Sequence, residues 1–250
     1  AFMITIVQAL ILEDLAKNNK LQDIFNHKKV GFYVGSFDPL HKGHQEAAYL
    51  AIKHGLCDYV LIYPAWGGDS YKNRVDIKYR LDMIFSIFEK DPHVIVTRLP
   101  PAKLQDLLTL PDNTRLVNDK PTVKPAFKGI EFIGIIGSDV ALEIIDNPEA
   151  LAPFMQGLRI PEKYKEHTIG GIISLPVKRF IVTRRMEDDL SSLNGKVGDR
   201  PIIAILQDNE TQGHSSTAAK KALQEDRPID TMIDERIRKI IKENSLYQAQ

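Results

Sequence analysis

The chain has 250 residues, and its 33 lysines and arginines balance its 33 aspartates and glutamates, so the formal net charge is zero. This balance argues against a protein that coats nucleic acid, because such proteins usually carry a strong basic excess. With 43% hydrophobic residues and no apolar run near the ~20 residues of a membrane-spanning helix, the composition is that of a globular protein. The single cysteine, Cys57, excludes an intramolecular disulfide and favours a reducing compartment. We therefore expect a cytoplasmic protein without membrane or nucleic-acid partners.

The first 27 residues have a helical pattern of apolar side chains, unlike the alternating strand and helix patterns of the rest of the chain. Residues 4–25 carry apolar side chains at roughly helical spacing, which predicts one or two amphipathic helices. The apolar stretch at residues 4–12 is not preceded by basic residues, so it does not resemble a signal peptide. We expect residues 1–27 to form an N-terminal helical extension and residues 28–250 to form the main domain.

From residue 28 onward, short apolar runs alternate with amphipathic segments. Strands are expected at residues 30–34, 59–63, 94–97, 131–136, 179–183 and 202–206. Helices are expected at residues 43–54, 76–89, 140–146, 216–224 and 231–244. Two segments rich in proline or glycine, at residues 111–128 and 156–176, are expected to be mostly loop and irregular structure. This alternation predicts an α/β fold with a doubly wound parallel sheet, whose ligands bind at the carboxyl ends of the strands.

The first expected strand runs directly into the string Gly-Ser-Phe-Asp-Pro-Leu-His-Lys-Gly-His, which begins at Gly35. A glycine at Gly35 lets the backbone approach a ligand closely, and the helix that begins near Gly43 offers free amide groups to a phosphate. His41 and His44 can donate hydrogen bonds to phosphate oxygens. A metal site or two ordinary surface histidines are the alternatives, but no companion cysteine or carboxylate cluster accompanies the pair, so we expect no metal ligands.

This string resembles the signature of the HxGH nucleotidyltransferase superfamily, whose members have a Rossmann-like doubly wound sheet. Those enzymes transfer a nucleotidyl group from a nucleoside triphosphate to a phosphate or similar acceptor and release pyrophosphate. The resemblance implies that His41 and His44 are catalytic. It also implies that the residues around them bind ATP and its phosphates, namely Gly35, Ser36, Phe37, Lys42 and Gly43.

A second element of the resemblance lies near the C-terminus, where the family has a helix start of the form Ile-Ser-Ser-Thr-x-x-Arg. Here Ser215, Ser216 and Thr217 are followed by Lys220 in place of the arginine. Serine and threonine at a helix start are also common caps, so this string is specific only together with the first motif. The resemblance implies that these residues hold the triphosphate. Lysine keeps the charge of the arginine but loses its bidentate fork.

The middle of the chain resembles the nicotinamide and nicotinate mononucleotide adenylyltransferases. A proline-ended strand leads to Tyr71-Lys72, to a helix with Tyr79-Arg80 where the family has His-Arg, and later to Gly137-Ser138-Asp139. The chain also ends in a helix followed by Leu246-Tyr247, as in the family. The resemblance implies nucleotide contacts by Gly137 and Asp139. It implies an acceptor site formed by Lys72, Arg80, Trp66 and Arg184.

Two family elements of the pyridine site are missing from the sequence. The family has a Thr-x-x-Thr-Leu-like stretch after the third strand, where this chain has Arg98-Leu99-Pro100-Pro101-Ala102. It also has a tryptophan soon after Gly-Ser-Asp, whereas the only tryptophan here is Trp66. These departures make the acceptor site the least determined part of the resemblance.

The resemblance thus implies transfer of the adenylyl group of ATP, with Mg²⁺, to the phosphate of a nicotinate or nicotinamide mononucleotide in NAD biosynthesis. Two alternatives stay open: another phosphorylated acceptor, and a nucleotide-binding regulator with weak catalysis. The partners expected are ATP and a small phosphorylated acceptor, and the sequence leaves a homo-oligomer open. We expect the functional basic groups to converge on one positive cleft at the strand ends, and acidic residues elsewhere to cancel their charge in the net sum of zero. These groups are His41, Lys42, His44, Lys72, Arg80 and Lys220.

Overall fold

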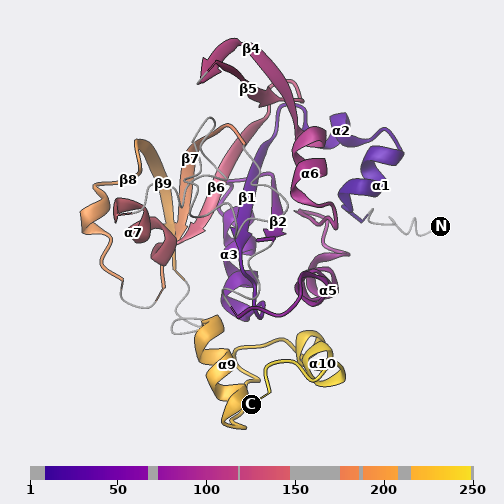
Figure 1. The fold of residues 1–250 in the computed structure, drawn as a ribbon, viewed down its shortest axis with the longest axis vertical. Helices are drawn as coiled ribbons and strands as arrows, with labels where there is room; N and C mark the ends of the chain where they lie inside the picture. The colour runs from indigo at the N-terminus through magenta and orange to yellow at the C-terminus, as the bar shows by residue number, and fades with distance from the viewer. Residues whose placement is uncertain are drawn as a thin grey trace, which may run out of the picture.

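The computed structural model describes residues 9–66, 73–117, 119–146, 175–185, 188–207 and 215–248. These residues form a seven-stranded sheet in the order β3-β2-β1-β6-β7-β9-β8 (Figure 1). Its parallel strands are β1 (Lys29–Gly35), β2 (Tyr59–Pro64), β3 (Val94–Ile95), β6 (Glu131–Gly137), β7 (Val177–Thr183) and β9 (Arg200–Leu206). The short β8 (Lys196–Val197) pairs with β9 in the antiparallel sense. The predicted α/β fold with a mostly parallel sheet is confirmed.

Strand β1 lies at the switch point of the sheet. The chain proceeds from β1 to β2 and β3 on one side, and then crosses to β6, β7 and β9 on the other. Both faces of β1 are covered, because the successive residues Phe32 and Tyr33 are almost fully buried in two different hydrophobic clusters. This explains why the strand is a nearly continuous apolar run and not an alternating one.

Helices cover both faces of the sheet. One core cluster joins the sheet to α3 (Lys42–Lys53), α5 (Ile77–Phe88), α9 (Ser216–Gln224) and α10 (Glu235–Glu243). The other cluster joins it to α1 (Leu12–Lys17), α2 (Leu21–Phe25), α6 (Pro101–Leu108) and α7 (Ser138–Asp146), and a short 3₁₀ helix, η2 (Ser191–Leu193), adds Leu193. None of the helices in the described ranges is long and apolar enough to span a membrane.

The N-terminal helices share the core of the sheet. Ile11 forms a parallel bridge with Val96, and the Leu12 amide donates to the Val96 carbonyl at 3.0 Å. Leu12 and Phe25 are completely buried, and the Phe25 ring lies 4.9 Å from that of Phe127. The two predicted amphipathic helices are therefore present as α1 and α2, while residues 1–8 lie outside the described part of the chain.

The prediction of mostly loop at residues 111–128 is wrong. Strands β4 (Thr109–Val117) and β5 (Lys120–Pro125) pair as an antiparallel ribbon that projects from one end of the sheet (Figure 1). Proline cannot donate to a strand ladder, but each strand of a two-stranded ribbon has an unpaired edge where a missing donor costs nothing. Helix α6 also escaped prediction, and it begins at a proline, which favours the first helical position. Residues 156–174, in the second segment predicted to be irregular, lie outside the described ranges.

Candidate active site

A cavity of about 490 Å³ lies at the carboxyl ends of the parallel strands, where ligands of α/β sheets bind. Its walls include the carboxyl ends of β1, β6, β7 and β9, at Gly35, Gly137, Thr183 and Leu206. The N-terminal turns of α3 and α9 complete it. Neither of these turns holds an acidic residue, so the positive ends of both helix dipoles are left for an anionic ligand. The volume is in the range of small-molecule sites.

The loop between β1 and α3 is shaped around Phe37. This residue has a positive φ of 48° and is buried, and its ring stands edge-on to the His44 ring at 4.9 Å between centroids. A side chain at Gly35 would come within 3.1 Å of the Phe37 ring. Gly35 lines the cavity, and its lack of a side chain also makes room for the ring that lies against His44.

His41 and His44 form a stacked pair in the cavity wall. Their ring centroids are 3.6 Å apart, and each side chain is less than a tenth exposed. The backbone amide of His41 donates to Nδ1 of His44 at 3.1 Å, so the proton of the neutral His44 ring lies on Nε2. The pKa of His44 is lowered well below its usual 6.5, mainly by burial and then by His41 and Arg185. Near neutral pH, His44 is therefore a neutral hydrogen-bond donor.

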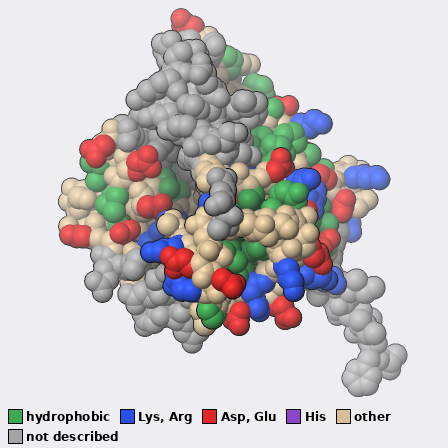
Figure 2. Space-filling model, turned by 60° about the horizontal axis from the view of Figure 1, so that its bottom comes forward, with side chains coloured by type: hydrophobic (Ala, Val, Ile, Leu, Met, Phe, Trp, Pro, Cys, Tyr) green, Lys and Arg blue, Asp and Glu red, His purple; other side chains and the backbone are tan. Residues whose placement is uncertain are grey.

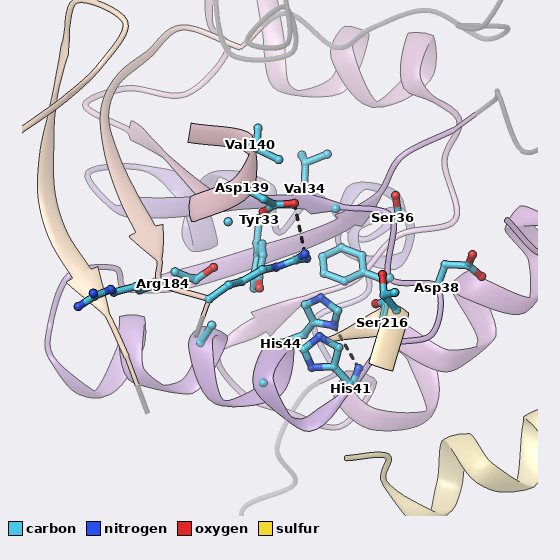
Figure 3. Close-up of a pocket in the computed structure, with 18 of the residues that line it drawn as sticks. Tyr33, Val34, Ser36, Asp38, His41, His44, Asp139, Val140, Arg184 and Ser216 are labelled. Atoms are coloured by element: carbon cyan, nitrogen blue, oxygen red, sulfur yellow. Dashed lines mark hydrogen bonds and ion pairs between the residues drawn. The ribbon is translucent and has the colours of Figure 1, made fainter. Parts of the chain in front are cut away.

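Helix α9 brings the second motif to the same cavity. Ser215 caps the helix, since its Oγ accepts from the Ala218 amide at 3.0 Å, and its side chain does not line the cavity. The Ser216 hydroxyl donates to the carbonyl of Pro39 at 3.0 Å and so joins two motifs 177 residues apart. Thr217 and Lys220 line the wall. The two strings on which the resemblance rested are thus neighbours in space (Figure 3).

The Gly-Ser-Asp motif forms the opposite wall. Asp139 pairs with Arg185, with 3.2 Å between Oδ2 and Nη1. A side chain at Gly137 would come within 2.5 Å of the Asp139 carboxylate and would have to displace it. The buried Ser138 hydroxyl accepts from the Arg185 amide at 2.8 Å and donates to Asp188 at 2.6 Å. This motif therefore fixes the end of β7 as well as lining the cavity.

Comparisons with known proteins found one curated relative and several similar folds, although no family model matches the chain. The probable nicotinate-nucleotide adenylyltransferase of Fusobacterium nucleatum is 24% identical over 215 residues, which cover 86% of this chain and 97% of the relative. The chain resembles the nicotinate-nucleotide adenylyltransferases of the HxGH type. Two structures of Plasmodium falciparum nicotinic acid mononucleotide adenylyltransferase, complexed with APC and with NaAD, share the fold. Their TM-scores are 0.55 and 0.56 at 17% and 18% identity, and each covers 88% of this chain and 98% of its own.

Two basic residues expected in the nucleotidyltransferase-like site have structural partners instead. Arg80 is completely buried, and its guanidinium donates to the carbonyls of Ser36, Ala65 and Val75 at 2.7–3.1 Å. It braces the ends of β1 and β2 against the start of α5 and does not line the cavity. The Lys42 ammonium donates to the Asp230 carbonyl at 2.8 Å and is likewise absent from the wall.

The three other residues expected in the acceptor site, Trp66, Arg184 and Lys72, differ in where they lie relative to the cavity. Trp66 packs half-buried against the core cluster of α1 and α2 and does not line the cavity. Arg184 touches the wall, but its guanidinium donates to the Asp188 carbonyl at 2.9 Å and points away from His41 and His44 in Figure 3. Lys72 lies outside the described residues. Of the four residues expected to form the acceptor site, the described structure therefore places Arg184 alone at the cavity wall.

Two arginines of the cavity wall, Arg74 and Arg185, were not predicted from the sequence as site residues. Arg185 follows the arginine that was chosen, and its position one residue further along a strand end points it into the cavity. Arg74 follows the Tyr71-Lys72 loop, and its Nη1 donates to the Ser36 hydroxyl at 3.2 Å. A basic residue next to each family motif was the available signal, but a single sequence does not say which of two neighbours faces the ligand.

The prediction of a positive cleft is wrong for the described part of the wall. Four basic residues line the cavity together with four acidic ones, although the guanidinium of Arg184 turns away: the basic residues are Arg74, Arg184, Arg185 and Lys220, and the acidic ones are Asp38, Glu46, Asp139 and Glu143. Acidic and basic side chains are also interspersed over the face shown in Figure 2. Two of the acidic groups pair directly with Arg185 and Lys220. Within the described ranges, no group of three or more histidine, cysteine or acidic side chains is arranged to hold a metal ion.

Proposed function

We propose that the protein transfers the adenylyl group of ATP to the phosphate of a pyridine mononucleotide, nicotinate or nicotinamide mononucleotide, and releases pyrophosphate. The observation that carries the proposal is the stacked pair formed by His41, the N-cap of α3, and His44 in its first turn, which line the same cavity as Thr217 and Lys220 of α9. The printed name of the Fusobacterium relative and those of the Plasmodium structures support nicotinate mononucleotide as the first acceptor to test.

The reaction needs no nucleophile from the protein. An oxygen of the acceptor phosphate attacks the α-phosphorus of ATP in line with the departing pyrophosphate. The new P–O bond forms at the α-phosphorus as the bond from that atom to the bridging oxygen of the β-phosphate breaks. Catalysis then depends on holding two anions in line and on donors for the charge that develops.

His44 is suited to the α-phosphate because it is neutral and buried. Its Nε2 proton can be donated to a nonbridging oxygen, and its orientation is fixed by the His41 amide on one side and the Phe37 ring on the other. A donor held in place before the reaction needs no reorganisation as negative charge builds up. Lys220, with the first-turn amides of α9 and the Thr217 hydroxyl, is suited to the β- and γ-phosphates.

Mg²⁺ enters this reaction as part of the MgATP substrate. It would reduce the repulsion between the triphosphate and the acceptor phosphate and would leave with pyrophosphate. The acceptor phosphate would be met by Arg185 and Arg74, which line the wall on the side of β7 and β1. Lys72 and Trp66 stay predictions for the pyridine side.

The proposal is tested by incubating the protein with MgATP and one acceptor at a time, and by measuring both pyrophosphate and the adenylylated product. The acceptors are nicotinate mononucleotide, nicotinamide mononucleotide, phosphopantetheine and glycerol 3-phosphate. We expect dinucleotide and pyrophosphate in equal amounts with a pyridine mononucleotide. Product with only one of the other acceptors would contradict the acceptor assignment, and MgATP binding without product from any acceptor would contradict the activity.

A further inference from the structure

The C-terminal tyrosine, Tyr247, reaches the cavity wall through a buried carboxylate. Its hydroxyl donates to Oδ1 of Asp38, a residue of the motif between β1 and α3 that is only 1% exposed. Oδ2 of the same carboxylate pairs with Nζ of Lys220 at 2.6 Å. Tyr247 and Lys220 therefore each bind one oxygen of the same carboxylate, although Lys220 lies in α9 and Tyr247 follows α10.

Tyr247 also contacts Lys220 directly. The Lys220 ammonium lies 5.7 Å from the centroid of the Tyr247 ring, on the side where a ring attracts a cation. The backbone is bent to bring the tyrosine there, because Ser245 and Tyr247 both have positive φ values, 51° and 59°, which residues other than glycine rarely adopt. Leu246 between them is anchored by a 3.0 Å hydrogen bond from its amide to the carbonyl of Ile241.

The third partner of the carboxylate fixes its rotation. The Val75 amide donates to Oδ1 at 3.3 Å, so Oδ1 faces two donors while Oδ2 faces the lysine. Burial raises the pKa of Tyr247 above its usual value, and the negative charge of Asp38 raises it further, so the phenol stays a donor throughout the working pH range. A carboxylate held in one rotamer can hold the lysine ammonium in one place. Lysine depends on such a partner more than arginine does, because its ammonium sits on a flexible stem and has no planar fork.

We propose that Tyr247 is a positioning residue that, through Asp38 and its own ring, holds the Lys220 ammonium at the cavity wall for the triphosphate of ATP. This inference rests on the proposed function for the identity of the ligand. The arrangement of Tyr247, Asp38 and Lys220 belongs to the protein without ligand, so it has a test of its own. It gives the Leu-Tyr ending of the chain a role in nucleotide binding.

The first experiment needs no nucleotide. The rate at which an N-hydroxysuccinimide ester acylates Lys220 is measured by peptide mapping in the wild-type protein and in Tyr247→Phe, with the 74% exposed Lys239 as an internal reference. Loss of one hydrogen bond to the carboxylate should raise the Lys220 rate about threefold to tenfold relative to Lys239. An unchanged or lower rate would overturn the proposal whatever reaction the protein catalyses.

The second experiment measures the dissociation constant of MgATP and the steady-state constants. We expect Tyr247→Phe to weaken MgATP about threefold to tenfold and to raise its KM, with the acceptor KM and kcat nearly unchanged. Tyr63→Phe is the matched control, because it also loses a buried hydroxyl bond, from Tyr63 to the Leu99 carbonyl at 2.7 Å, far from Lys220 in the hydrogen-bond network. A general loss of stability would affect both variants alike.

A double-mutant cycle then separates positioning from packing. In a Lys220→Ala background, Tyr247→Phe should have no further effect on MgATP affinity, because the group that it positions is gone. Additive losses would overturn the proposal. If the wild-type protein binds no MgATP, the proposed function fails, while the acylation result still decides the arrangement around Lys220.

Discussion

The N-terminal ends of α3 and α9 face the same cavity but are built in opposite ways. The end of α3 is closed by His41 and His44, two buried rings stacked at 3.6 Å, and the pKa of His44 is lowered by burial. The end of α9 is capped by the Ser215 hydroxyl and offers Lys220, a partly exposed cation paired with Asp38 at 2.6 Å. The first end offers the cavity a buried neutral imidazole at His44, and the second offers a cation held by an ion pair at Lys220.

The difference suggests a division of labour between the two ends. A neutral donor in a buried site can stabilise charge that appears only in the transition state, so it should act on kcat. A partly exposed ammonium attracts the triphosphate in the ground state and the transition state alike, so it should act mainly on KM for MgATP. Four substitutions or conditions test this division, beginning with the largest expected effect.

The largest effect is expected for His44→Asn. The asparagine carbonyl can still accept from the His41 amide, as Nδ1 of His44 does, but no donor remains at the position of Nε2. We expect kcat to fall about 10²- to 10³-fold while the protein stays folded. The rate of pyrophosphate release and a thermal melt measure the two quantities. The control is His54→Asn at the exposed end of the same helix, and wild-type turnover in His44→Asn would contradict the role of α3.

The next effect is expected for Lys220→Ala. Loss of the ammonium should raise the KM for MgATP about tenfold and lower kcat much less. Because Asp38 would then be buried without its cation, the variant should also melt at a lower temperature. Lys220→Arg restores the charge and gives the residue that the family has at this position, so it should recover MgATP affinity. A loss of kcat equal to that of His44→Asn would remove the distinction between the two helix ends.

A smaller effect is expected on the wall that belongs to neither helix. Arg185→Gln should raise the KM for the acceptor about threefold to tenfold, because this guanidinium faces the cavity beside Asp139. Arg184→Gln is the matched control, since that side chain turns to the Asp188 carbonyl. The two KM values, for acceptor and for MgATP, are measured in both variants. A larger effect at Arg184 would restore the choice made from the sequence.

The smallest effect concerns pH and stability. The folded pKa of His44 lies well below 6.5, so the unfolded chain binds a proton that the folded chain refuses as the pH falls below 6.5. Stability should therefore be fully present above pH 6.5 and should decrease below it, with a slope of up to about 1.4 kcal/mol per pH unit from this group. Denaturant unfolding from about pH 8 to about pH 5 measures the slope. The slope should be shallower in His44→Asn and unchanged in His54→Asn.

Much of the cavity wall around α3 could be predicted from local sequence. The apolar run of β1 with Gly35 at its end, the histidine pair and the serine cap of α9 all depend on contacts within a few residues, and the structure places Gly35 and the two histidines at the wall of one cavity. The helix at residues 216–224 has the predicted bounds, whereas the last helix begins at Glu235, after its cap Asp234, and not at residue 231. Local signals therefore locate a helix better than they locate its first residue.

The β4–β5 ribbon shows where local signals fail. Its prolines predicted a loop, but pairing with a partner strand decided the structure, and such pairing is not visible in either strand alone. The prediction that Arg80 belongs to the acceptor site failed for a related reason. A buried arginine that donates to three backbone carbonyls has the same sequence context as one that binds a phosphate, and only the fold says which acceptors surround it.

The zero net charge of the chain likewise did not reveal how its charged side chains are paired. By itself, the sequence determined the alternating α/β fold and the two motifs that meet at the cavity, because apolar periodicity and turn chemistry act over short distances. Only the tertiary structure decided which charges meet. It set Asp38 against Lys220 and Asp139 against Arg185, it turned Arg80 and Lys42 away, and it brought Tyr247 back to the cavity. Ion pairs between residues far apart in the chain depend on packing, which composition does not specify.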